Sequence, residues 1–170
     1  MMIPTFPMAA FTKSAAHSLH PDTLGWLREH DPLPVVGWRD QVIDALGHDP
    51  RSEYVEIFWL PIIGPSCTLA ARRFAAWLDA EPAGFEVSVS CFASSLGLGR
   101  GSGRNAPVNR TLGRLVDFGI ARLDGLAFAV RRSFPPLAAR QIARLADHLV
   151  ELHAEHLAAG HHPGRAEASR

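Results

Sequence analysis

The stretch that decides the fold is NAPVNRTLGRLVDFGIARLDGLAFAVR, residues 105–131. Its first half predicts a helix over 106–118, because residues that suit a helix cap, first turn and end stand at the right places. These residues are Asn105, Pro107 and Gly119. Asp124 and Gly125 then separate two short apolar runs, and this dipeptide is typical of a tight turn between antiparallel strands. The second half therefore predicts a β-hairpin over about 120–131.

The residues ahead of this stretch complete a winged helix-turn-helix order. From Gly64 we expect a helix with one apolar face, made of Leu69, Ala70, Phe74, Trp77 and Leu78. A short strand over 85–89, a brief helix over 91–96 capped by Ser90, and a glycine-rich loop over 97–105 follow. The order helix, strand, helix, loop, helix and hairpin is that of a winged helix-turn-helix, whose two-helix unit and β-ribbon reach into a nucleic-acid groove.

The flanking regions predict further helices and two tails. Short helices are expected over 21–29 and 38–46, with a break between them at the prolines of residues 31–34. The fold class is expected to be mainly α with a small β-hairpin (α+β). The predicted division of the chain is a flexible tail (1–20), a winged helix-turn-helix domain with an N-terminal helical extension (21–136), a C-terminal helix (137–158) and a flexible tail (159–170).

Positive charge is concentrated in one part of the chain. The 170 residues have a formal net charge of zero, yet residues 97–144 hold nine arginines against two aspartates, a net charge of +7. Sixteen arginines against one lysine indicate a general arginine bias, so the clustering carries the information and the choice of arginine does not. A polyanion responds to such a local field, so this segment is predicted to bind double-stranded DNA.

Apolar and polar side chains fall on opposite faces of the predicted helix 106–118. The polar face holds Arg110, Gly113, Arg114 and Asp117, with Asn109 and Thr111 on its flanks. Arginine suits guanine and phosphate, and asparagine suits adenine. The candidate DNA-binding residues are therefore Asn105, Asn109, Arg110 and Arg114 on or beside this helix, Arg100 and Arg104 in the loop, and Arg122, Arg131 and Arg132 on the hairpin.

Patterns for other chemistries are weaker. His153 and His156 share a helix face as a metal-ligand pair would, but no cysteine joins them, and His156 also falls in an apolar stripe. The glycine-rich loop lacks the ending of a phosphate-binding loop, and no nucleophile motif is present. We expect no enzyme activity, no metal and no cofactor.

The cysteines and the apolar runs bear on the cellular compartment. Cys67 and Cys91 lack the spacing of a metal or redox motif, and both are expected to be buried and reduced. No apolar run is long enough to span a membrane, and Lys13 interrupts the N-terminal run before a signal peptide could form. The expected location is cytoplasmic, with no membrane contact.

Four runs of the sequence carry a family resemblance: YVEIFWLPIIGPS (54–66), LAARRF (69–74), PVNRTLGRLVDFGIA (107–121) and VRRSFPPL (130–137). They resemble a group of uncharacterised winged helix-turn-helix proteins of high-GC bacteria, which implies no assigned activity. The run LPIIGP (60–65), ahead of a helix, is similar to the opening of the winged-helix domains of DnaD-like replication initiators. This second resemblance implies the winged-helix fold and a replication or regulatory role.

The sequence thus predicts a DNA-binding winged-helix protein that acts as a transcriptional regulator, with the recognition helix at 106–118 and the wing at 120–131. The C-terminal helix either packs back on the domain or forms a homodimer. Two alternatives remain. One is a protein-interaction adaptor that uses the winged helix and the C-terminal helix, and the other is an accessory factor in replication or plasmid maintenance.

Overall fold

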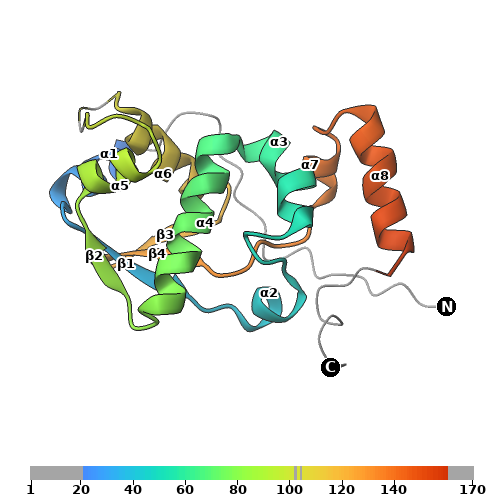
Figure 1. Ribbon diagram of the computed structural model, residues 1–170, viewed down its shortest axis with the longest axis horizontal. Helices are drawn as coiled ribbons and strands as arrows, with labels where there is room; N and C mark the ends of the chain where they lie inside the picture. The colour runs from blue at the N-terminus through green and yellow to red at the C-terminus, as the bar shows by residue number, and fades with distance from the viewer. Residues whose placement is uncertain (1–20, 102, 104, 161–170) are drawn as a thin grey trace.

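The chain folds into a four-stranded sheet and a set of surrounding helices (Figure 1). The computed structural model describes residues 21–160 apart from Ser102 and Arg104, so the predicted tail 1–20, Arg104 and residues 161–170 lie outside the described residues. In chain order the elements are α1 (Pro21–Glu29), β1 (Leu33–Trp38), α2 (Gln41–Leu46), the π-helix η2 (Val55–Trp59), α3 (Leu60–Ile63), α4 (Pro65–Ala80), β2 (Phe85–Val87), α5 (Val89–Ser95), α6 (Pro107–Asp117), β3 (Ala121–Asp124), β4 (Ala127–Arg131), α7 (Ala139–Ile142) and α8 (Asp147–Ala158). The fold class is α+β, as predicted.

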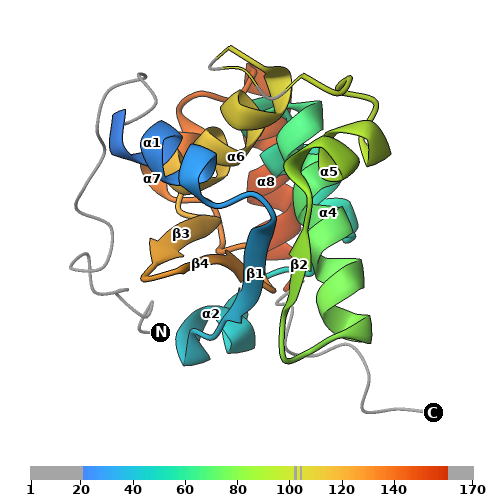
Figure 2. The same ribbon diagram turned by 90° about the vertical axis from the view of Figure 1, so that its left-hand side faces the viewer.

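The sheet has the strand order β2-β1-β4-β3 (Figure 2). The predicted hairpin is confirmed as β3 and β4, in which Asp124 pairs with Ala127 and leaves a two-residue turn. Gly125, in that turn, has a φ of 63°, a left-handed conformation that glycine adopts without steric cost. The predicted turn is therefore present, but its two residues are Gly125 and Leu126, and Asp124 is the last residue of β3.

Strand β1 occupies a region where the sequence predicts a break and a helix. The helix expected over 38–46 is wrong in its first turn, because Trp38 ends β1 and α2 begins only at Gln41. β1 pairs in parallel with β4, starting with Val35 opposite Phe128. Pro34 lies one residue ahead of that ladder, so its missing N–H costs no hydrogen bond to β4. Pro32 and Pro34 therefore lie at the start of a strand and not in a loop.

The elements α4, β2, α5 and α6 follow one another in the predicted order. α4 packs on the sheet, where the ring centroid of Phe74 lies 6.0 Å from that of Phe128. α5 starts two residues earlier than predicted, because Asp31 Oδ1 accepts a hydrogen bond from Val89 N, at the start of the helix. Ser90, the predicted cap, lies inside the helix as a result. This contact joins residues far apart in the sequence, which a local pattern cannot show.

Large aromatic side chains fill the core, and α6 packs against them. The fully buried rings are Phe58, Trp59, Phe74, Phe92, Phe128 and Phe134. Val108, Leu112 and Leu115 of α6 are 0% exposed, which confirms the predicted apolar stripe. Burying each such side chain stabilises the fold by roughly 1.5–3 kcal/mol, so α6 is firmly held.

One of the two cysteine predictions is wrong. Cys67 on α4 is buried, as expected, but Cys91 on α5 is exposed. The inward positions of α5 are taken by Val89, Phe92 and Ala93, so Cys91 points outward from this short helix.

The single helix predicted over 137–158 is also wrong, because the chain forms two helices, α7 and α8, with a break between them. Leu145 is only 7% exposed and reaches the core from the break. Ala146 then takes an extended conformation with a ψ of 150°, and α8 begins at Asp147, an acidic residue that favours a helix start. Apolar residues face inward on both sides of the break, so the helical periodicity conceals it.

Helix α8 is attached to the domain through a cluster of Tyr54 and histidines. Tyr54 Oη accepts a hydrogen bond from Leu137 N at 3.0 Å and lies 3.0 Å from His153 Nε2. The ring of His48 stacks on that of Tyr54 at 3.5 Å, and the His156 ring lies 5.3 Å away. Because His153 is 3% exposed, burial lowers its pKa, and the neighbouring His156 lowers it further.

This cluster predicts a pH-dependent stability. The folded state holds His153 neutral, whereas the unfolded chain protonates it near its ordinary pKa of 6.5. The stabilisation is therefore present above pH 6.5 and lost as the pH falls below it. We expect the His153→Gln variant to lose less unfolding free energy than the wild type between about pH 7.5 and about pH 5.5, measured by urea unfolding.

The matched control is His148→Gln, which replaces an exposed histidine on the same helix. It should retain the pH dependence of the wild type. Equal pH dependence in all three proteins would contradict the assignment of this effect to His153.

Candidate nucleic-acid interface

The cap of helix α6 lies one residue later in the chain than predicted. Ala106 occupies the cap position, and its carbonyl accepts hydrogen bonds from Asn109 N at 3.1 Å and Arg110 N at 3.3 Å. Asn105 therefore does not cap α6 and lies exposed in the preceding turn. Pro107 fixes the start, because a proline at the first helical position needs no N–H partner.

Three residues expected on the polar face of α6 or its flanks are buried: Asn109, Thr111 and Gly113. Asn109, a predicted base-reading residue, is 3% exposed, and its Nδ2 donates to Gly103 O at 2.9 Å. Its side chain thus ties the glycine-rich loop to α6, which a helical wheel of α6 alone cannot reveal. Gly113 is buried as well, in contrast to the predicted polar face. The long side chains of Arg110 and Arg114 are exposed, as predicted.

Although Arg114 is exposed, its side chain also makes contacts within the domain. Its Nη2 donates to the carbonyls of Ile62 and Ile63, at 3.4 and 3.2 Å, where α3 ends. Its guanidinium also lies 5.4 Å from the ring centroid of Phe118, directly after α6. Arg110 has no such contact among the described residues, so it is the cleaner probe of what α6 binds.

The three arginines of the hairpin are all engaged in ion pairs. Arg122 pairs with Asp124 at 2.7 Å and keeps 48% of its side chain exposed. Arg131, at 11% exposure, pairs with Asp40 at 2.8 Å. Both guanidiniums lie over Trp38, at 4.6 Å for Arg122 and 3.6 Å for Arg131. These two arginines therefore hold β3, β4 and the end of β1 together.

Arg131 is less exposed than Arg122 and makes more hydrogen bonds within the domain. Its Nε donates to Gly119 O at 2.8 Å, in addition to its pair with Asp40. The hydrogen bond from Arg131 holds the pKa of the Asp40 carboxyl below its usual range, against the opposing effect of burial. A phosphate would have to displace that carboxylate before it could bind Arg131.

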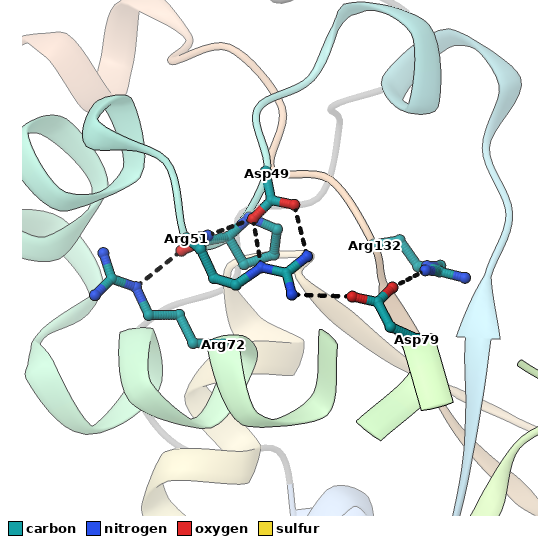
Figure 3. A network of polar contacts seen from close by, with 6 residues as sticks. Asp49, Arg51, Arg72, Asp79 and Arg132 are labelled. Carbon is teal, nitrogen blue, oxygen red and sulfur yellow. Dashed lines mark hydrogen bonds and ion pairs between the residues drawn. The ribbon is translucent and has the colours of Figure 1, made fainter. Parts of the chain in front are cut away.

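Arg132 belongs to a separate network that joins three parts of the chain (Figure 3). Asp79 on α4 accepts hydrogen bonds from Arg132 and from Arg51 Nη1, the latter at 2.9 Å. Arg51 also pairs with Asp49 at 2.9 Å, and Arg72 Nε donates to Pro50 O at 3.0 Å. The network ties the segment after α2 and the end of β4 to α4, so Arg132 serves the fold.

The arginines therefore divide into paired and unpaired groups. Within residues 21–160, other than 102 and 104, the arginines with a carboxylate within 4.0 Å are Arg51, Arg72, Arg122, Arg131 and Arg132. In the same described ranges, those without one are Arg28, Arg39, Arg73, Arg100, Arg110, Arg114, Arg140 and Arg144. Sequence clustering did identify Arg100, Arg110 and Arg114, but it could not distinguish them from the paired arginines of the hairpin.

The tip of the hairpin is in contact with α1. Trp26 Nε1 donates to Gly125 O at 3.1 Å, and the Trp26 ring stacks on that of His30 at 3.9 Å. Leu126, the other residue of the turn, remains 78% exposed. The turn is thus partly held by the N-terminal helix and is not a free-standing wing.

Comparison of the chain with family models, with curated proteins and with solved structures finds no match. Across residues 21–160, excluding 102 and 104, no three histidine, cysteine, aspartate or glutamate side chains are grouped as metal ligands. No helix in that part of the chain has both the length and the apolar character needed to cross a membrane.

The contrast between Arg131 and Arg122 gives a stability prediction. Arg131→Ala would leave the Asp40 carboxylate and the Gly119 carbonyl without their partner, and should lower the unfolding free energy by about 2 kcal/mol. Arg122→Ala removes an exposed pair and should cost less than about 1 kcal/mol. Urea unfolding of the two variants measures the difference. Equal losses would contradict a larger stabilising role for the partly buried Arg131–Asp40 pair.

Proposed function

We propose that this protein is a winged helix-turn-helix protein that binds double-stranded DNA through α6 and acts as a transcriptional regulator. The order α4, β2, α5, α6 and the β3–β4 hairpin supports this assignment, since it is the order of a helix-turn-helix followed by a wing. β1 is an addition to that plan, because it lies between β2 and β4 in the sheet.

The observation that carries the proposal is that the two arginines of α6 are exposed and have no carboxylate partner among the described residues. Arg110 and Arg114 are exposed on a helix whose opposite face is fixed in the core, and neither has a carboxylate within 4.0 Å among the described residues. Arg100, in the loop ahead of α6, is exposed and unpaired in the same sense. Such arginines bind phosphate without first losing an internal ion pair.

The proposal places the DNA contact on a different set of residues from the sequence prediction. Arg100, Arg110 and Arg114 remain in it, and the exposed Asn105 lies beside them. Asn109 is left out because its side chain is buried, and the hairpin arginines are left out because each is bound to an aspartate. The contacts with phosphate would come from α6 and its preceding loop.

Arg110→Ala is the direct test. The purified full chain should bind fluorescent duplex DNA, and its affinity should fall steeply with salt. Removing one arginine contact with phosphate should raise the Kd roughly tenfold or more, because a hydrogen bond to a charged group contributes about 1.5–3 kcal/mol and about 1.4 kcal/mol is tenfold in Kd. Fluorescence anisotropy at about 50 mM salt, with urea unfolding to confirm an unchanged fold, measures this effect.

Arg39→Ala is the matched control. Arg39 is also exposed and has no carboxylate partner among the described residues, but it lies between β1 and α2 in the chain. Helix α2 lies away from α6 in both ribbon views (Figures 1 and 2). Its loss removes the same charge and should leave the Kd nearly unchanged. Absence of binding by the wild type, or equal effects of the two substitutions, would refute the proposal.

A second candidate function is a protein-interaction role through α8, which one observation favours. Leu152 and Leu157 lie on the same half of α8 as the buried His153, yet they are 40% and 51% exposed. The domain thus leaves part of the apolar side of α8 uncovered, as a helix that pairs with a second copy would.

A variant with Leu152→Glu and Leu157→Glu tests this candidate. If α8 forms a homodimer, the wild type should sediment as a dimer in analytical ultracentrifugation and the variant as a monomer, because two charges oppose burial of the face. Exposed Leu126→Glu on the hairpin turn is the control. A wild type that sediments as a monomer up to about 100 μM excludes pairing by a stable interface.

A further inference from the structure

We propose that Arg140 and Arg144 form a second phosphate-binding segment, so that the DNA interface runs from α6 onto α7 and the turn after it, and not onto the hairpin. This inference rests on the proposed function and adds two residues that are not among the candidate DNA-binding residues taken from the sequence. It concerns which surface of the domain meets the DNA backbone.

The first observation is the arrangement of two arginines around one ring. Phe118 follows α6 directly, and the guanidinium of Arg114 lies 5.4 Å from its ring centroid. The guanidinium of Arg144 lies 5.8 Å from the same centroid. The two cations can therefore be no more than about 11 Å apart, although thirty positions separate them in the sequence. This places the charge of the α7 segment directly beside that of α6.

The second observation is how firmly the α7 segment is held. Arg140 and Arg144 are exposed, while the residues that follow them, Gln141 and Leu145, are 9% and 7% exposed. Gln141 Oε1 accepts a hydrogen bond from Ala138 N at 2.7 Å, which fixes the start of α7. Each arginine is thus adjacent to a buried anchor, so its side chain extends from a positioned backbone and loses less entropy on binding.

The third observation is electrostatic. Neither Arg140 nor Arg144 has a carboxylate within 4.0 Å in the described part of the chain, although Asp147 begins α8 only three residues beyond Arg144. On the hairpin side, Arg122, Arg131 and Arg132 are all neutralised by aspartates. Arg144, in the turn after α7, therefore brings positive charge without a carboxylate partner next to the end of α6.

These positions match the spacing of a polyanion. Phosphates of one strand advance 3.4 Å along the duplex axis, so cations within about 11 Å of one another can contact neighbouring phosphates. Arg114 and Arg144, whose guanidiniums both lie against the Phe118 ring, would bind neighbouring phosphates, and Arg140, four residues before Arg144, would extend the contact along the α7 segment.

The test compares two double variants that remove equal charge. One is Arg140→Ala with Arg144→Ala, and the control is Arg39→Ala with Arg73→Ala, which removes two exposed, unpaired arginines elsewhere. Binding of a fluorescent duplex is measured over a range of salt concentrations. The slope of log K against log salt should fall in magnitude by about 1.8 for the α7 variant, or about 0.9 per lost contact, and stay near the wild-type value for the control.

The outcomes separate the two proposals. If Arg110→Ala weakens binding but the α7 variant has the slope of its control, the extension onto α7 is overturned and the role of α6 stands. If the wild type does not bind duplex DNA, both are overturned. A second variant, Arg140→Gln with Arg144→Gln, keeps much of the side-chain length and must show the same loss of slope, which separates lost charge from lost packing.

Discussion

The parallel pairing of β1 with β4 is the interaction on which the rest of the structure depends. It joins the N-terminal third of the chain to the hairpin, from Val35 opposite Phe128 to Trp38 opposite Arg131. β2 reaches the sheet only through β1. Without this pairing, β1 and the β3–β4 hairpin would not belong to one sheet, and the core side chains of β1 would lose their partners.

The same pairing decides which arginines remain available to a partner. It brings Trp38 and Asp40 against Arg131, so a residue that would serve a wing on its own becomes part of an internal ion pair. A ligand that competes for such a guanidinium must first replace the aspartate, and that cost is subtracted from binding. Arg110 and Arg114, on α6, remain among the arginines that have no carboxylate within 4.0 Å in the described ranges.

Much of this fold could be predicted from local patterns, and the failures have a common cause. The apolar stripe of α6 and the turn at Gly125 follow from helical periodicity and from turn chemistry. β1, the break before Asp147 and the ion pairs of Arg131 and Arg132 depend on contacts with distant residues. The side chain of Asn109 bonds to the loop just ahead of α6, which helical periodicity does not describe. For the candidate site, clustering located the right third of the chain, but only the fold separates Arg110 from Arg131.

The close packing of α6 against α4 limits which of its side chains could contact DNA. Gly113 and Thr111 are buried, and Cys67 Sγ donates to Thr111 O at 3.6 Å, so α6 lies close against α4. Arg110, Arg114 and the acidic Asp117 are exposed on its outer face. Asn109 and Thr111, short polar side chains of the kind that read base edges, are buried. Phosphate contacts position a protein and base contacts specify the sequence. If α6 binds DNA as proposed, its affinity would come chiefly from charge, and its sequence preference from Arg110 or from the shape of the duplex.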